Sequence, residues 1–313
     1  MKILVVGASG NLGSHLARRL LTQAYDLPLL RHKSAVRLES KPNCEIVDGD
    51  LDNPASLRGV CNGVDCVVYV AGVLFRPRPA SFLRRTNTIY AQNMIAAALA
   101  AGTRKFIFMS FPHVEENTTP AAPARGLLDV EPRSIHARTW LDAEKYLFRV
   151  CANQSMRPVV LRAGVIYGRG VKLTEAARWL LRRRLLAVWR RPTGIHLLAM
   201  PDLLRIVDLA VQNEQLSGVY NICDDQPILL QEFLDRLASH WGFVQPRRLP
   251  AGFFYGAAAL CEMLATLFRT GTPLTRDMVH MAMTSVVADT SRMKHEIVST
   301  LLYPTLAEGL RIC

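Results

Sequence analysis

Three glycines near the amino terminus stand at the spacing of a phosphate-binding turn. Gly7, Gly10 and Gly13 follow an apolar run at 2–6 and open a segment with leucine at every fourth position. Gly7 allows a sharp exit from a strand, Gly10 lets a pyrophosphate approach the backbone, and Gly13 lets the helix pack against the strand. The unpaired amide groups of such a helix bind phosphate. The pattern therefore predicts a strand, a turn and a helix that hold a dinucleotide.

The residue at the end of the second predicted strand, 26–31, bears on which dinucleotide binds. An acidic residue at this point hydrogen-bonds the adenosine ribose 2′-hydroxyl of NAD, whereas a guanidinium suits the 2′-phosphate of NADP. The strand ends in Arg31. The sequence therefore favours NADP(H) as cofactor, with NAD(H) as the alternative.

Strands and helices alternate through the first half of the chain. Apolar runs at 44–51, 65–72, 105–110 and 159–162 predict further strands, and the segments 88–101 and 133–152 predict helices between them. This alternation predicts an α/β fold, a Rossmann doubly wound parallel sheet. Ligands bind beyond the carboxyl ends of such strands, which here hold Gly7, Arg31, Asp50, Ala71, Ser110 and Arg162.

The regular alternation of short strands and helices ends after Gly164, where the predicted helical segments become longer and richer in arginine. One more strand, 218–222, is expected to return to the sheet. We therefore predict a Rossmann domain of 1–168 plus about 195–222. A smaller C-terminal substrate lobe is expected from about 169–194 and 223–313.

The composition of the chain limits the classes of protein and the kinds of site that we expect. The 313 residues are 50% hydrophobic and carry a net charge of +12, and the seven cysteines have no metal-binding spacing. We predict a cytoplasmic protein without a bound metal, a nucleic-acid partner, a signal peptide or a membrane span. The segment 178–191 is expected to be a helix with a solvated basic face. The segment 253–268 is expected to be a core-facing helix, with contact to a membrane surface or a lipophilic site as the alternative.

The order of motifs resembles the extended short-chain dehydrogenase/reductase superfamily, in its NAD-dependent epimerase/dehydratase and 3β-hydroxysteroid dehydrogenase-like branch. The matching pieces include GASGNLG at 7–13, DGDLDNPASL at 48–57, GVDCVVYVAG at 63–72, LRAGVIYG at 161–168 and SGVYNICDDQPILLQEFL at 217–234. They span nearly the whole chain in the order of that superfamily. The resemblance implies a nicotinamide cofactor and a small carbonyl or hydroxyl substrate.

The resemblance also implies a Tyr-x-x-x-Lys pair, in which the tyrosine passes a proton and the lysine holds the nicotinamide ribose. The matching register places His136 at the tyrosine position and Trp140 at the lysine position. A histidine exchanges protons near neutral pH, so His136 is the predicted replacement. Ser110 is expected to polarise the substrate oxygen, and His113 is a second candidate acid or base.

The sequence leaves three functions open: an oxidoreductase or epimerase that uses His136, a non-redox isomerase, cyclase or lyase, and an inactive cofactor-binding or assembly protein.

The resemblance also allows a homodimer through 88–101 and 136–152. Predicted substrate contacts are Phe75, Arg76, His113, Tyr167 and Trp189. The predicted cofactor contacts are Gly7, Ser9, Gly10, Asn11, Leu12, Gly13, Arg31, Asp50, Leu51, Ala71, Gly72, Trp140 and Ala163.

Overall fold

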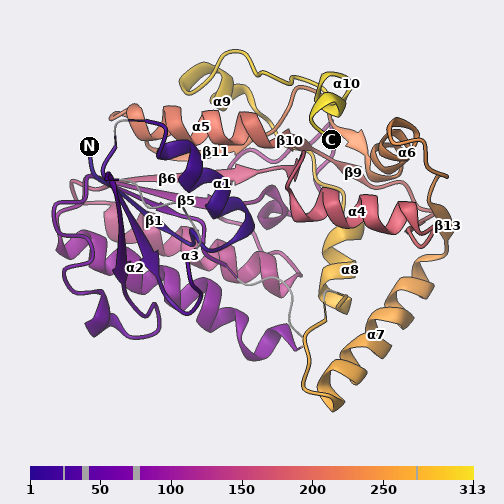
Figure 1. Cartoon of the computed structure of the whole chain (residues 1–313), viewed down its shortest axis with the longest axis horizontal. Helices are drawn as coiled ribbons and strands as arrows, with labels where there is room; N and C mark the ends of the chain where they lie inside the picture. Colours follow the sequence, from indigo (N-terminus) through magenta and orange to yellow (C-terminus); the bar gives the residue numbers. More distant parts are fainter. Residues whose placement is uncertain (24, 37–41, 73–77, 273) are drawn as a thin grey trace.

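The computed structural model describes residues 1–23, 25–36, 42–72, 78–272 and 274–313. Its centre is a seven-stranded sheet in the order β11-β6-β5-β4-β1-β2-β3, and every neighbouring pair is parallel (Figure 1). The strands are β1 Ile3–Val6, β2 Leu27–Arg31, β3 Cys44–Asp48, β4 Cys66–Tyr69, β5 Lys105–Ser110, β6 Arg157–Ala163 and β11 Gly218–Ile222. The predicted doubly wound sheet is confirmed, including the returning strand at 218–222.

Helices cover both faces of the sheet because each central strand is apolar on both sides. In β1, Ile3 and Val5 pack into one hydrophobic cluster, whereas Leu4 and Val6 pack into the other. The first cluster includes α1, Asn11–Leu20, and α5, Met200–Gln212. The second includes α2, Tyr90–Ala100, and α3, Ile135–Cys151. A π-helical turn, Arg84–Ile89, leads into α2.

Most of the remaining elements lie beyond the carboxyl ends of the strands (Figure 1), whereas the short helix Ser291–Glu296 packs beside β11. They include three small two-stranded pairings, β7 with β10, β9 with β12 and β8 with β13. The strands are β7 Val165–Tyr167, β8 Ala187–Trp189, β9 Gly194–Ile195, β10 Leu197–Ala199, β12 Ile228–Leu229 and β13 Arg247–Leu249. The helices are α4 Lys172–Arg182, α6 Leu230–His240, α7 Ala251–Leu267, α8 Arg276–Met283, α9 Ser291–Glu296 and α10 Leu306–Gly309.

Two sequence-based expectations for this part of the chain are wrong. The basic segment 178–191 is not one helix, because α4 ends at Arg182 and the chain turns into β8. The segment 253–268 is helical but not core-facing. Within α7 only Ala258 and Ala265 are buried. Phe254 is half-buried against Trp189, but most of the other large apolar side chains lie on the surface.

Candidate active site

The glycine turn between β1 and α1 is closed so tightly that two of its positions exclude any side chain. Gly7 has φ +102°, and a Cβ atom on it would lie 2.7 Å from the backbone nitrogen of Ala71. A Cβ atom on Gly13 would lie 2.1 Å from the carbonyl oxygen of Gly7. The backbone of β4 and the start of α1 are therefore held directly against the end of β1.

The backbone N–H groups in the first turn of α1 receive no side-chain cap from the described residues. Gly10 is its N-cap and offers no side chain to the helix, and the first turn carries no acidic residue. The Asn11 side chain points elsewhere, because its amide donates to the carbonyl of Gly170 and its oxygen accepts from the amide of Lys172. Ser9 is exposed and Leu12 is half-buried. Uncapped helix amides next to a glycine backbone are the donor set that a pyrophosphate requires, so the turn fits a dinucleotide.

The ends of β2 and β3 carry a charged pair where the adenosine ribose is predicted to lie. Arg31 donates from Nε and Nη2 to the two carboxylate oxygens of Asp48, at 2.5 and 2.6 Å, and both side chains are exposed. Nearby, the imidazole Nδ1 of His32 accepts from the amide of Leu51 and lies 3.1 Å from the Asp50 carboxylate. Burial is the main reason that the pKa of His32 is lowered.

Aromatic side chains fill the space at the ends of β4 and β5. Trp140 is only 7% exposed, and its ring centroid lies 5.1 Å from that of Phe108. A Cβ atom on Gly72 would lie 2.6 Å from Cζ2 of Trp140, so the indole packs against that backbone. The Oγ of Ser110 and the Nε1 of Trp140 are buried with no hydrogen-bond partner in the described part of the chain. Two polar groups are thus unused at the edge where the nicotinamide is predicted to bind.

His136, in the first turn of α3, is completely buried. Its Nδ1 lies 2.5 Å from an oxygen of Asp277, which belongs to α8 and is 141 residues distant in sequence. The same carboxylate accepts from the Ser134 hydroxyl and the Ile135 amide, both at 3.0 Å. Burial alone would raise the pKa of Asp277, but these hydrogen bonds more than offset it and hold the pKa below its usual value. Asp277 is therefore an anion at neutral pH, beside the imidazole.

The other predicted residues lie apart from this pair. His113 follows β5 in a short 3₁₀ turn, and burial lowers its pKa to about 4, so the ring is neutral at pH 7. It borders a cavity of only about 10 Å³ that it shares with His196 and Val286. Trp189 is only 7% exposed, and its Nε1 donates to the Thr193 hydroxyl at 2.7 Å.

Two further predicted contacts are buried, and two lie outside the described residues. Tyr167 is fully buried, and its ring centroid lies 6.0 Å from that of Phe233. Ala163 is buried at the end of β6, in register with Ile222. Phe75 and Arg76 lie outside the described residues.

The sequence did not reveal that Arg162 is an internal charge centre. Its guanidinium is fully buried and donates to Glu144 of α3 and to Glu115, with N–O distances of 2.6 and 2.5 Å. Glu115 in turn accepts from the backbone amides of Arg125 and Gly126. Each of the three guanidinium nitrogens donates within the protein, and Nη2 also donates to the Leu127 carbonyl at 2.9 Å. This strand-end residue therefore binds the 115–127 loop to the sheet.

A hollow of about 720 Å³ opens beside the His136–Asp277 pair. Ile135, Arg138 and Asp277 line one side of it, and α7 lines the other with Ala259 and Met263. Further lining residues are Arg78, Pro79, Ala80, Glu262, Thr266 and Arg276. The hollow combines apolar side chains with three arginines and the carboxylates of Glu262 and Asp277, and Glu262 is already paired with Arg276.

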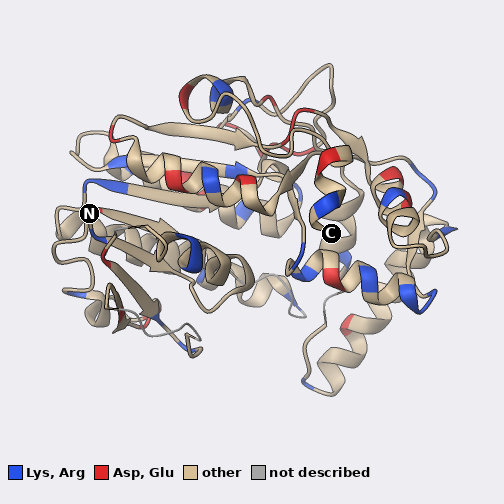
Figure 2. Ribbon diagram, turned by 45° about the horizontal axis from the view of Figure 1, so that its top comes forward, with Lys and Arg blue, Asp and Glu red and all other residues tan. Residues whose placement is uncertain are grey.

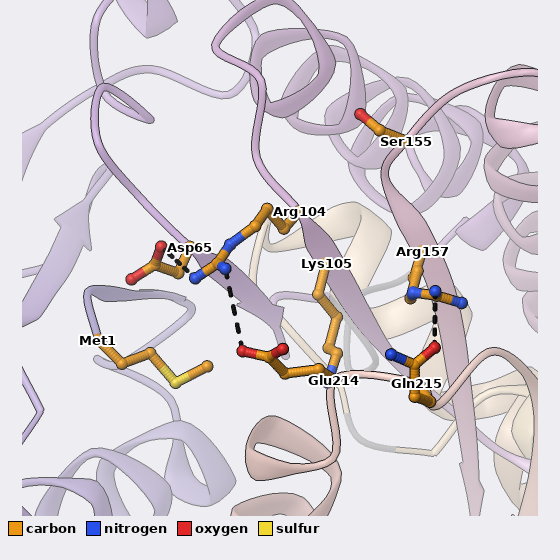
Figure 3. A pocket seen from close by; sticks show the side chains of 8 residues that line it. All are labelled: Met1, Asp65, Arg104, Lys105, Ser155, Arg157, Glu214 and Gln215. Carbon is orange, nitrogen blue, oxygen red and sulfur yellow. Dashed lines mark hydrogen bonds and ion pairs between the residues drawn. The ribbon is translucent and has the colours of Figure 1, made fainter.

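Another hollow, of about 240 Å³, lies at the opposite end of the sheet, around the start of β5 (Figure 3). Its charged groups are already paired. Arg104 contacts Asp65 and Glu214, and the Lys105 ammonium donates to the carbonyls of Ala210, Val211 and Asn213. Lys105 thus caps the C-terminus of α5, and the hollow is a structural feature away from the strand ends that carry the site.

Two further features of the described residues bear on other classes of site. No group of three or more His, Cys, Asp or Glu side chains among them is arranged to hold a metal ion. None of the helices in the described part of the chain is both long and apolar enough to cross a bilayer.

Comparison with known proteins identifies the family to which the chain belongs. The NAD dependent epimerase/dehydratase family matches residues 3–223. The chain is 28% identical over 294 residues to a 2-alkyl-3-oxoalkanoate reductase from Stenotrophomonas maltophilia, which covers 88% of this chain and 87% of the relative. It is 25% identical over 181 residues to a UDP-glucose 4-epimerase from Vibrio cholerae, covering 56% of this chain and 55% of that enzyme.

Solved structures show the same fold. The dTDP-glucose 4,6-dehydratase DesIV from Streptomyces venezuelae, solved with NAD and TYD bound, superimposes with a TM-score of 0.79 at 17% identity, covering 100% of this chain and 95% of the other. The glycine turn, the parallel sheet and the family match over 3–223 agree. The chain belongs to the NAD-dependent epimerase/dehydratase family.

Proposed function

We propose that the protein is an NADP(H)-dependent oxidoreductase that acts on a carbonyl or hydroxyl substrate. The observation that carries this proposal is the first turn of α1, where uncapped amide groups face a backbone that admits no side chain at Gly7 or Gly13. The bound nicotinamide supplies the hydride acceptor or donor. The protein residues supply binding, orientation and proton transfer.

The preference for NADP(H) follows from Arg31. Its partner Asp48 is exposed, and exposed ion pairs contribute little to stability. A 2′-phosphate carries more charge than one carboxylate and accepts bidentate hydrogen bonds from a guanidinium, so it competes well for Arg31. Asp50 next to His32 offers the alternative contact, to the 2′-hydroxyl of NAD(H).

His136 is proposed to move the proton. An anionic Asp277 beside Nδ1 orients the imidazole and favours the tautomer with the proton on that nitrogen, and Nε2 is the proposed site of proton exchange. The ring has no exposure to solvent, so it exchanges protons with a group packed against it and not with bulk water. The unpaired hydroxyl of Ser110 is proposed to donate to the substrate oxygen.

The hollow beside Asp277 favours one kind of substrate. Arg78 and Arg138 attract an anionic group, while Met263 and Ala259 offer an apolar wall. We therefore propose an anionic carbonyl compound with an apolar chain. The name of the Stenotrophomonas relative, a 2-alkyl-3-oxoalkanoate reductase, describes a substrate of this class for that protein.

Epimerisation is the second candidate, because the chain also matches a UDP-glucose 4-epimerase. The two functions differ in their use of the cofactor. A reductase consumes NADPH in proportion to product, whereas an epimerase returns the nicotinamide to its starting state.

The first experiment is calorimetric titration of the nucleotide-stripped protein with NADPH, NADP⁺, NADH and NAD⁺. We expect binding of all four at one site, with tighter binding of the phosphorylated pair. NADPH oxidation is then followed with 3-oxoacids of increasing chain length, in the wild type and in His136→Ala. Failure of all four nucleotides to bind refutes the proposal, and unchanged turnover in His136→Ala refutes the role of that residue.

A further inference from the structure

Helix α7 projects from the body of the molecule with an apolar surface that no other part of the described chain covers (Figure 1). Leu267 and Phe268 are 71% and 68% exposed. The large apolar residues are spaced so that they share one side of the helix. They are Phe253, Leu260, Leu264, Leu267 and Phe268, and are called the α7 face below.

The opposite side of α7 attaches the helix to the protein. Ala258 and Ala265 are buried there. Glu262, the one charged residue within α7, points to the same side and accepts from the Arg276 backbone amide and guanidinium at 2.8 and 2.9 Å. No charge and no strong hydrogen-bonding group is therefore left on the α7 face.

Arginines lie at both ends of the α7 face. Strand β13, which leads into α7, pairs with β8. That pairing brings the start of α7 close to Arg190 and Arg191, which follow β8. Arg183 and Arg184 follow α4, in the turn that leads into β8. At the other end of α7 is Arg269. Figure 2 shows basic residues gathered at the end of α4 next to α7.

These arginines are free to meet an anion. All five are exposed, and none has an acidic side chain within 4 Å in the described ranges. Next to them, the exposed Trp179 of α4 stacks under the guanidinium of Arg183 at 4.1 Å. Indole rings and arginines are the side chains that favour the headgroup layer of a bilayer.

We propose that the α7 face lies flat in the surface of a membrane that contains anionic lipids, with the arginines on the headgroups. A helix of 17 residues is too short to span a bilayer but long enough to lie in its interface. A second copy of the chain is a poor occupant, because it would bring two sets of arginines together. A protein partner is disfavoured because the face offers no polar group to fix its register.

The test is co-sedimentation of the full chain with vesicles, in the absence of nucleotide. One set contains phosphatidylcholine alone, and the other contains equal parts of phosphatidylcholine and phosphatidylglycerol. We expect binding to the anionic vesicles, weakened by salt. Leu267→Glu should lower the partition coefficient on the order of tenfold or more, and each of Arg183→Gln and Arg269→Gln should lower it about fivefold.

A matched control separates the α7 face from a general effect of added charge. Ile46→Glu places the same charge on an exposed apolar position of β3, 46% exposed at the far edge of the sheet, and should retain most of the binding. Equal binding of wild type and Leu267→Glu overturns the proposal, as does an absence of binding to anionic vesicles. A light-scattering mass of two chains that falls to one in Leu267→Glu would assign the face to a dimer instead.

Discussion

Asp277→Asn tests the link between α8 and the first turn of α3. The Asp277 carboxylate accepts hydrogen bonds on both oxygens, from His136 and Ser134 on one and from the Ile135 amide on the other. An asparagine offers one oxygen and one NH₂ group, so at least one donor loses its acceptor. Losing a buried hydrogen bond to a charged group costs about 1.5–3 kcal/mol, and a donor left unpaired adds to that cost. We expect the free energy of unfolding to fall by about 3 kcal/mol at pH 7.

The lowered pKa of Asp277 determines how the stability difference between wild type and Asp277→Asn changes with pH. The pKa of Asp277 is lower in the folded protein than in the unfolded chain. Its contribution to stability is therefore complete above the unfolded pKa of about 3.9 and is lost as the pH falls through the lower, folded pKa. The difference between wild type and Asp277→Asn should be constant from pH 7 to about pH 5 and should shrink in more acidic solution.

Urea unfolding followed by circular dichroism measures this difference across the pH range. Asp48→Asn is the matched control, because it removes the same charge from an exposed pair with Arg31 and should leave stability unchanged. Nucleotide affinity of Asp277→Asn should be that of the wild type, while the single-turnover rate falls. A difference in stability that stays constant into acid, or a variant as stable as the wild type at pH 7, would refute the reasoning.

Three further substitutions test the site. Gly13→Ala places a Cβ 2.1 Å from the Gly7 carbonyl oxygen, so titration calorimetry should show loss of nucleotide binding, whereas unchanged affinity would contradict the predicted turn. Gly72→Ala forces the Trp140 indole to move and should cost about 1–3 kcal/mol in urea unfolding; adding Trp140→Phe should recover part of that loss, and strict additivity would argue against the contact. Arg162→Met leaves buried carboxylates unpaired and should cost about 3–5 kcal/mol at pH 7, so a variant of wild-type stability would contradict the internal charge centre.

The sequence was sufficient where structure depends on neighbours along the chain. The β1 run, the glycine turn and α1 are determined by residues within a few positions of each other, and their order was predicted correctly. The parallel sheet followed from the alternation of apolar runs and helical segments. The strand-end rule then placed Ser110 at the sheet edge, although its unpaired hydroxyl was visible only in three dimensions.

Contacts between elements far apart in the chain could not be predicted from a single sequence. Arg31 was expected to be free for a phosphate, but the register of β2 with β3 sets it opposite Asp48. The Asp277 partner of His136 is 141 residues away, and no local pattern marks it. The composition of α7 resembles that of a buried helix, because an apolar face that packs on the protein and one that does not consist of the same residue types. The placement of Ala258, Ala265 and Glu262 separates the two faces.

Because His136 and Asp277 lie on different helices, the proposed site depends on the packing of α8 as well as on α3. In a Tyr-x-x-x-Lys arrangement both side chains belong to one helix, so their geometry is set by that helix alone. Here the imidazole belongs to α3 and its carboxylate to α8, so the proposed proton carrier is oriented only while α8 is in place. Arg276, the residue before Asp277, is held by Glu262 of α7. Since α7 is the helix that we propose to rest on a membrane, a movement of α7 on that surface reaches His136 through a short chain of hydrogen bonds and ion pairs. The reduction rate of the wild type should therefore respond to anionic vesicles, and that response should be absent in Leu267→Glu.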